Sequence, residues 1–144
     1  MILVIGAAAS GKTEYVKSLG FTDSDIANAV MDERPVLNNL QDMVFSDPDG
    51  SANLYDELLK KSVVICNEVG SGIIPVERTE RDAREATGRL CNRLAQAAER
   101  VVRLVCGIPR SFDEDGVILG SSCRIGVCPV KADLGSRYGF QHAW

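Results

Sequence analysis

The sequence lacks a long apolar run and an excess of basic residues. No stretch approaches the ~20 apolar residues that span a bilayer, so we expect no membrane span. Sixteen Lys and Arg stand against 20 Asp and Glu, a net charge of -4, which argues against a general nucleic-acid binder. No basic leader precedes the first apolar residues, so we expect no secretory signal and a cytoplasmic location.

Paired cysteine motifs are also absent. The five cysteines show no C-x-x-C spacing, and Cys66 and Cys106 lie in apolar runs, where we expect small buried side chains. Cys123 and Cys128 have only the distant His142, the one histidine of the chain, as a nitrogen ligand, which does not favour a zinc site. The 144 residues, 45% hydrophobic and 25% charged, fit one domain with its own core.

A phosphate-binding motif stands at the start of the chain. The apolar run 2–5 is followed by G-x-x-x-x-G-K-T, the P-loop pattern, and then by a helix-forming stretch. Its residues are Gly6, Ala7, Ala8, Ala9, Ser10, Gly11, Lys12 and Thr13. The two glycines let the backbone N–H groups surround phosphate oxygens, Lys12 can reach the β- and γ-phosphates, and the Thr13 hydroxyl can ligate Mg²⁺. We expect a nucleoside triphosphate site, with Lys12 on a solvent-facing loop.

The rest of the chain alternates strands with helices, which predicts an α/β fold with a mainly parallel sheet flanked by helices. Besides the first strand, the pattern predicts strands over 26–32, 62–66 and 101–106, the last ended by 107–109. Helices are predicted over 12–19, 35–45, 54–61 and 75–100. After residue 109 the periodicity fades, with short strands expected over 117–119 and 124–127. We divide the chain into a nucleotide-binding domain (1–109) and a C-terminal extension of that domain (110–144).

A second polar segment follows the predicted strand 62–66 and reads N-E-V-G-S-G-I-I-P over 67–75. Because parallel strands share their carboxyl edge, we expect this segment to face the phosphate loop. The candidates on the substrate side are Asn67, Gly70, Gly72, Arg78 and Arg81. The arginines at three-residue steps have two interpretations. They contact phosphate or carboxylate groups, or they form a solvated face paired with neighbouring acids, which composition alone favours.

Together, the P-loop, the N-E-V-G-x-G-I-I-P segment, the spaced arginines and the strand ending at 107–109 resemble the adenosylcobinamide kinase/adenosylcobinamide-phosphate guanylyltransferase family of cobalamin biosynthesis. The resemblance covers residues 1–20 and 62–109. It implies a P-loop NTPase-like fold, assembly into a homo-oligomer, ATP or GTP as phosphoryl donor with Mg²⁺, and the corrinoid adenosylcobinamide as substrate. Family members phosphorylate the aminopropanol hydroxyl and then transfer GMP through a guanylylated histidine.

The chain departs from this family in residues 21–61, which form a truncated middle, and in its histidine. His142 matches no family motif, so the resemblance implies a kinase whose guanylyltransferase step is lost. Asp32 is the best candidate for the Walker B carboxylate that holds Mg²⁺ with Thr13, and an ordinary turn aspartate is the equal alternative. Glu68 is a second acidic candidate, which makes Lys12, Asp32 and Glu68 the catalytic set. The other interpretation of the chain is a degenerate nucleotide-binding module or subunit.

Overall fold

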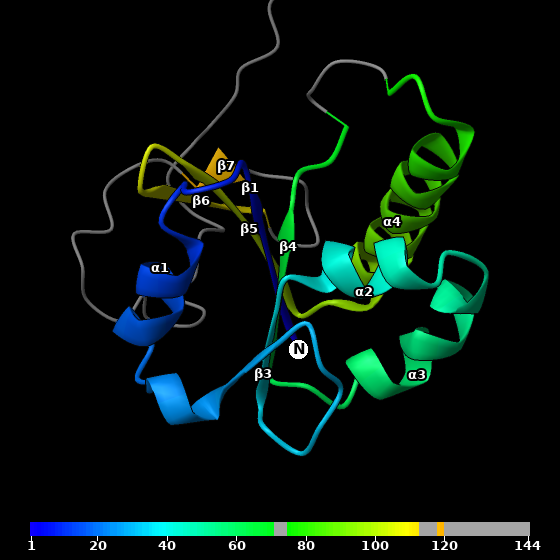
Figure 1. Cartoon of the computed structure of the whole chain (residues 1–144). Coiled ribbons are helices and arrows are strands. Elements are labelled where there is room, and N and C mark those ends of the chain that lie inside the picture. The colour runs from blue at the N-terminus through cyan, green and yellow to red at the C-terminus, as the bar shows by residue number, and fades with distance from the viewer. Residues whose placement is uncertain (71–74, 113–117, 120–144) are drawn as a thin grey trace, which may run out of the picture.

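The computed structural model describes residues 1–70, 75–112 and 118–119. They form a seven-stranded sheet with the order β2-β3-β4-β1-β5-β6-β7 and helices on both faces (Figure 1). The strands from β2 to β5 run parallel, and β6 and β7 complete one edge in antiparallel fashion. The α/β fold with a mainly parallel sheet is therefore confirmed.

The strands are β1 (Ile2–Gly6), β2 (Ile26–Asn28), β3 (Val36–Asn38), β4 (Val63–Asn67), β5 (Arg100–Val105), β6 (Ile108–Phe112) and β7 (Ile118–Leu119). The helices are α1 (Lys12–Ser18), α2 (Leu40–Ser46), α3 (Tyr55–Leu58) and α4 (Arg78–Ala97). Two 3-10 turns, η1 (Asp23–Asp25) and η2 (Asp49–Leu54), lie between them. No helix within these described residues is long and apolar enough to cross a membrane.

The central strands are buried on both faces, which explains why they read as continuous apolar runs. Successive side chains point to opposite faces. Leu3 and Val64 belong to a core cluster packed under α2, α3 and α4, whereas Val4 and Ile65 belong to a second cluster under α1. Figure 1 shows α1 on one side of the sheet and the other three helices on the opposite side.

The long helix α4 has the amphipathic period that its sequence predicts. Its buried residues recur at three- and four-residue steps: Ala83, Thr87, Leu90 and Leu94. Buried Thr87 satisfies its hydroxyl by donating to the main-chain oxygen of Ala83 at 2.8 Å. The buried face of α4 can therefore pack against α2 and the sheet while the hydroxyl of Thr87 stays hydrogen-bonded.

The prediction of one helix over 35–45 is wrong in its first turn. Val36–Asn38 forms β3, which pairs in parallel with β2 and β4. Asn39 has φ 58°, a left-handed conformation that turns the chain, and α2 starts at the next residue. The apolar pair Val36 and Leu37 fits a helix face or a buried strand equally, and packing beside β4 decides for the strand. Residues 21–61, which we expected to be a truncated middle, thus hold two strands, and β2 ends at Asn28 rather than at residue 32.

The chain reverses after β5 in a two-residue turn instead of ending the sheet there. Cys106 and Gly107 both have positive φ, 50° and 78°, as a tight hairpin turn requires, and β6 returns antiparallel to β5. Cys106 is therefore exposed, contrary to expectation, whereas Cys66 is buried as expected. The short strand predicted near 117–119 is present as β7. Segment 124–127, Cys123, Cys128 and His142 lie outside the described residues.

Candidate functional site

The P-loop connects the carboxyl end of β1 to the start of α1 (Figure 1). Gly11 has φ 88°, a left-handed backbone that glycine adopts without strain, and Ala9 shares this region at φ 56°. At Gly6 a Cβ atom would lie 2.7 Å from the main-chain oxygen of Leu104 on β5. The first glycine of the motif is thus required by the neighbouring strand, and the second by the turn itself.

Lys12 is buried, with 6% of its surface exposed. The expectation that it lies on a solvent-facing loop is therefore wrong. Its Nζ donates to the main-chain oxygens of Gly6 at 3.2 Å and Ala7 at 2.5 Å, and to Ser10 Oγ at 3.4 Å. Burial lowers the pKa of Lys12 below its usual 10.5. The motif lysine is therefore folded against the loop, with its cation directed at the curve where phosphate oxygens bind in P-loop proteins.

The turn between β5 and β6 supports this loop from the side. The amide of Gly107 donates to the main-chain oxygen of Ser10 at 3.0 Å. A Cβ on Gly11 would meet the Cα of Gly107 at 3.4 Å, so the two backbones pass close together. Two tight turns from distant parts of the chain thus fix each other's position.

A hollow of about 320 Å³ opens over the P-loop. Its floor is the loop and the first turn of α1: Ala8, Ala9, Ser10, Gly11, Lys12, Thr13 and Glu14. Its wall is made of three asparagines at the carboxyl ends of β3 and β4, namely Asn38, Asn39 and Asn67. The structure therefore brings Lys12, Thr13 and Asn67 to one pocket at one edge of the sheet.

Side-chain amides connect this wall into a network. Asn28 Oδ1 accepts from Asn39 Nδ2 at 2.8 Å and from Asn38 Nδ2 at 3.3 Å. Gln41 Nε2 donates to Asn39 Oδ1 at 3.2 Å, and Gln41 Oε1 accepts from the main-chain N–H of Asn67 at 2.9 Å. The carboxyl ends of β2, β3 and β4 are thus joined by neutral groups that both donate and accept hydrogen bonds.

Asp32, the predicted Walker B residue, lies at the opposite edge of the sheet. Its carboxylate pairs with Arg34, whose Nε and Nη2 are 2.7 and 2.5 Å from Oδ2. Arg34 also donates to the main-chain oxygen of Ile26, the first residue of β2, and Lys61 holds the main-chain oxygens of Asp32 and Arg34. The β2–β3 connection runs to the amino ends of the strands, away from the P-loop (Figure 1).

Glu68 lies beside the P-loop, but its carboxylate is already paired. Its main-chain amide donates to the oxygen of Gly6 at 2.9 Å, which places the residue next to the motif. Its two carboxylate oxygens accept from Arg103 Nε and Nη2 at 2.9 to 3.2 Å. Glu68 does not line the pocket, so it has a structural partner rather than an open position for chemistry.

The spaced arginines Arg78 and Arg81 contact groups of the protein itself, and only Arg78 has the acidic partner that composition favours. Arg78 is 3.8 Å from Asp82, and 86% of its side chain is exposed. Arg81 Nη1 donates to the main-chain oxygens of Pro75 and Val76 and so secures the start of α4. Gly70 is exposed, and Gly72 lies outside the described residues. Neither Arg78 nor Arg81 lines the phosphate pocket.

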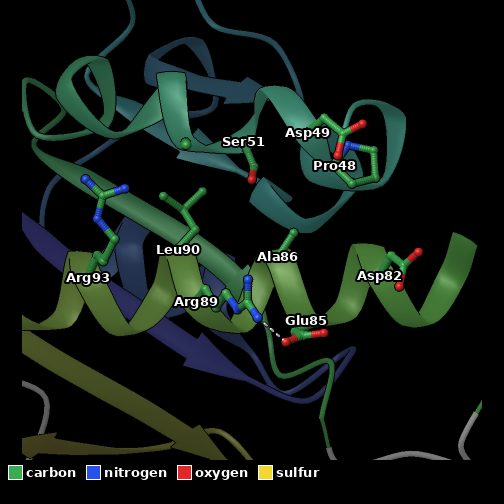
Figure 2. Close-up of a pocket in the computed structure, with 10 residues that line it drawn as sticks. Pro48, Asp49, Ser51, Asp82, Glu85, Ala86, Arg89, Leu90 and Arg93 are labelled. Atoms are coloured by element: carbon green, nitrogen blue, oxygen red, sulfur yellow. Dashed lines mark hydrogen bonds and ion pairs between the residues drawn. The ribbon is translucent and has the colours of Figure 1, made fainter.

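A second hollow, of about 450 Å³, lies between η2 and α4 (Figure 2). Four of its five charged residues have partners within the protein, one of them Asp82, which lies 3.8 Å from Arg78. Arg89 pairs with Glu85, and the Arg93 guanidinium lies 4.1 Å from the ring centre of Tyr55. Because most of its charges are paired within the protein and it carries no ligand-binding motif, the phosphate pocket remains the candidate site.

The donor set of the pocket does not fit a protein-bound Mg²⁺. P-loop enzymes hold this ion with the motif Ser or Thr and a Walker B carboxylate. Thr13 is present, but among the described residues the only carboxylate that lines the pocket is that of Glu14, which is 80% exposed and lies 3.5 Å from Lys17. Within the described part of the chain, no cluster of three acidic, histidine or cysteine residues could hold a metal.

Sequence reasoning missed Asn38, Asn39 and Gln41, because a helix was predicted to cover them. The signal that could have found them is the polar run Asn38-Asn39 directly after the apolar pair Val36-Leu37. Such a step from apolar to polar residues marks the carboxyl end of a buried strand, where α/β proteins bind ligands.

Comparison with known proteins adds independent information. Residues 24–112, more than half of the chain, match the family described as "Cobinamide kinase / cobinamide phosphate guanyltransferase". The bifunctional adenosylcobalamin biosynthesis protein CobU of Salmonella typhimurium is 48% identical over 48 residues, which cover 33% of this chain and 26% of that protein. The protein of the same name from Escherichia coli is 46% identical over 48 residues, with the same coverage.

Two features of these matches bear on the site. The aligned part spans about a quarter of the length of either relative, so their whole activities do not transfer automatically. The family match includes residues 24–61, which the expected resemblance left out, and begins after the P-loop, whose assignment therefore rests on its own geometry. With the α/β sheet, the phosphate loop and this match, the chain belongs to the cobinamide kinase/cobinamide phosphate guanylyltransferase family.

Proposed function

We propose that this chain is an NTP-dependent kinase of cobalamin biosynthesis that phosphorylates the hydroxyl of adenosylcobinamide. The hydroxyl oxygen attacks the γ-phosphorus of ATP or GTP, the bond to the β-γ bridging oxygen breaks, and a nucleoside diphosphate leaves. The hydroxyl proton passes to solvent. The expected second activity, GMP transfer, is absent from this proposal because no histidine occurs before residue 142.

The buried position of Lys12 carries the proposal. Its ammonium is held by the loop oxygens of Gly6 and Ala7, so it needs only a small movement to meet a phosphate oxygen. A cation poised in a water-poor site stabilises the charge of a transferring phosphoryl group more than an exposed lysine does. Phosphoryl transfer depends mainly on such positioning and charge neutralisation.

Incubation of the pure protein with adenosylcobinamide and ATP or GTP tests the proposal. The expected product is a phosphorylated corrinoid, detected by chromatography and mass spectrometry, together with one nucleoside diphosphate per turnover. A matched reaction with the Lys12→Met variant controls for contaminating kinases. No phosphorylated corrinoid at high protein concentration would exclude the kinase.

A nucleotide-binding module without turnover is the second candidate function. The observation that favours it is the wall of the pocket, where three asparagines stand and the described residues supply no unpaired carboxylate. Tight binding of ATP or GTP in calorimetry without any phosphorylated corrinoid would support this candidate over the kinase.

We also propose that the protein assembles with itself, as the resemblance implies. Light scattering coupled to size-exclusion chromatography measures this directly, and a monomer mass at micromolar concentration would exclude it. The corrinoid remains the proposed partner besides the nucleotide.

A further inference from the structure

The wall of the phosphate pocket is chemically unusual for a P-loop site. P-loop enzymes hold Mg²⁺ with the motif Ser or Thr together with a Walker B carboxylate. In this chain Asn38, at the carboxyl end of β3, lines the pocket together with Thr13 and offers a neutral amide instead of an acid. The acids described near the pocket have partners of their own: Glu14 lies 3.5 Å from Lys17, Asp42 accepts from Gln41 at 3.3 Å, and Glu68 pairs with Arg103.

An amide and a carboxylate act differently on a triphosphate. A carboxylate repels the phosphate oxygens until a cation lies between them, so it makes binding depend on the metal. A carboxamide carries no net charge and can donate its N–H groups to phosphate oxygens directly. Asn38, Asn39 and Asn67 thus add hydrogen-bonding groups to the pocket but no negative charge.

The amide network holds this wall in one arrangement. Asn28 Oδ1 accepts from both Asn38 and Asn39, and Gln41 connects Asn39 to the backbone of Asn67. The side chains of Asn38 and Asn39 and the backbone of Asn67 are therefore positioned by a neighbour before any ligand arrives. Positioned groups cost less entropy to engage, which makes them effective ligands for an anion.

We infer that this pocket binds the triphosphate as a free anion, with an affinity that does not depend on Mg²⁺, and that Asn38 determines this property. The inference rests on the proposed nucleotide site and specifies how that site recognises its ligand. Lys12 supplies the charge, and the asparagine wall supplies neutral donors in place of a metal-binding acid.

Calorimetric titration of the full chain with ATP and with GTP, in excess EDTA and in excess Mg²⁺, tests the inference. The expected dissociation constants in the two buffers agree within about threefold, because the asparagine wall carries no charge and Glu14, the carboxylate among the described lining residues, lies beside Lys17. Asn38→Asp is expected to weaken binding in EDTA by about tenfold and to recover affinity in Mg²⁺. Its affinity should therefore become metal-dependent where the original protein's is not.

Asn92→Asp is the matched control. It adds the same charge at an exposed position of α4 that does not line the phosphate pocket. Its dissociation constants should stay within about twofold of the original protein in both buffers, since exposed charges are screened over such distances. If Asn38→Asp does not give a cooperative melt, Asn67→Asp places a carboxylate at the end of β4 on the same wall and carries the same expectation.

The outcomes separate this inference from the proposed function. Binding that weakens more than tenfold when Mg²⁺ is removed overturns the inference and leaves the nucleotide site standing. Metal-independent binding that Asn38→Asp leaves unchanged overturns the role of Asn38. Absence of binding in both buffers overturns both the inference and the nucleotide site.

Discussion

At the scale of single residues, Lys12 shows how a buried charge can serve a ligand at little cost to the fold. The two main-chain oxygens that it contacts have other donors: Gly6 accepts from the amide of Glu68, and Ala7 from the amide of Ser10. Loss of the ammonium would therefore leave neither carbonyl unpaired. Because burial lowers the pKa of Lys12, its charge destabilises the free protein slightly rather than stabilising it.

Lys12→Met is thus expected to reduce triphosphate affinity by about ten- to a hundredfold, the value of one lost charge-assisted hydrogen bond. The melting temperature of the free protein should hardly change. Affinity of the original protein should also fall as pH rises toward the lowered pKa of Lys12, below 10.5, because the ligand binds the cation. The variant should show no such alkaline loss in the same calorimetric series. A flat profile in both proteins would contradict the role of Lys12.

Asp32 provides the opposite case, an acid predicted for the site that serves the fold. The Arg34 guanidinium lowers the pKa of its carboxyl below the usual 3.8, so the pair stabilises the protein above that pH. This contribution is lost as pH falls through the lowered pKa of the folded state. Asp32→Asn should leave nucleotide affinity unchanged within about twofold, since the residue lies at the far edge of the sheet.

Urea denaturation measures the other half of this expectation. The Asn variant should be slightly less stable at neutral pH, and the difference should vanish in acid, where Asp32 is protonated in both states. A large loss of nucleotide affinity in Asp32→Asn would show that the residue reaches the pocket after all.

At the scale of elements, we expect the substitution of glycine by alanine to have opposite effects on stability at two positions, one inside a helix and one at the end of a strand. Gly88 lies inside α4 with nothing within 4 Å of an added Cβ, so Gly88→Ala should stabilise the protein by about 1 kcal/mol through the unfolded chain. Gly6→Ala would place its Cβ 2.7 Å from the Leu104 oxygen and should destabilise by more than that. Urea denaturation checks both changes, and equal signs for the two would contradict this packing.

The same scale shows where sequence reasoning succeeds and fails. The β1 strand, the P-loop and α4 could be predicted because their patterns are local: an apolar run, a glycine-lysine motif and a sustained helical period. The strand Val36–Asn38 could not be predicted, because two consecutive apolar residues show neither a helical nor a strand periodicity. Its strand conformation comes from pairing with β2 and β4, which are distant in the sequence.

The site follows the same division. Lys12 and Thr13 reach the pocket because the motif encodes its own backbone. The sequence predicts that β2 extends to residue 32, which would place Asp32 at the carboxyl ends of the strands, beside the ligand. In the structure β2 ends at Asn28, and the next four residues lead back toward the amino ends of the strands, so Asp32 lies away from the pocket.

At the scale of the whole molecule, two independent observations meet at one edge of the sheet. The P-loop precedes the family match and is supported by its backbone geometry, whereas the asparagine wall lies within the match. The parallel order β3-β4-β1-β5 brings both to the carboxyl ends of neighbouring strands. The site thus depends on the complete sheet and not on the motif alone.

The last prediction concerns GMP transfer and follows from the position of the histidine in the sequence. A guanylylated intermediate needs an imidazole nitrogen to attack the α-phosphorus of GTP and release pyrophosphate, and residues 1–141 contain no histidine. The protein incubated with GTP should therefore keep its unmodified mass, measured on the intact chain, and release no pyrophosphate. A GMP adduct that disappears in His142→Asn would show that the C-terminal histidine takes over the step. An unmodified mass together with a phosphorylated corrinoid would show that this chain carries out the kinase step of the family's chemistry without the transferase step.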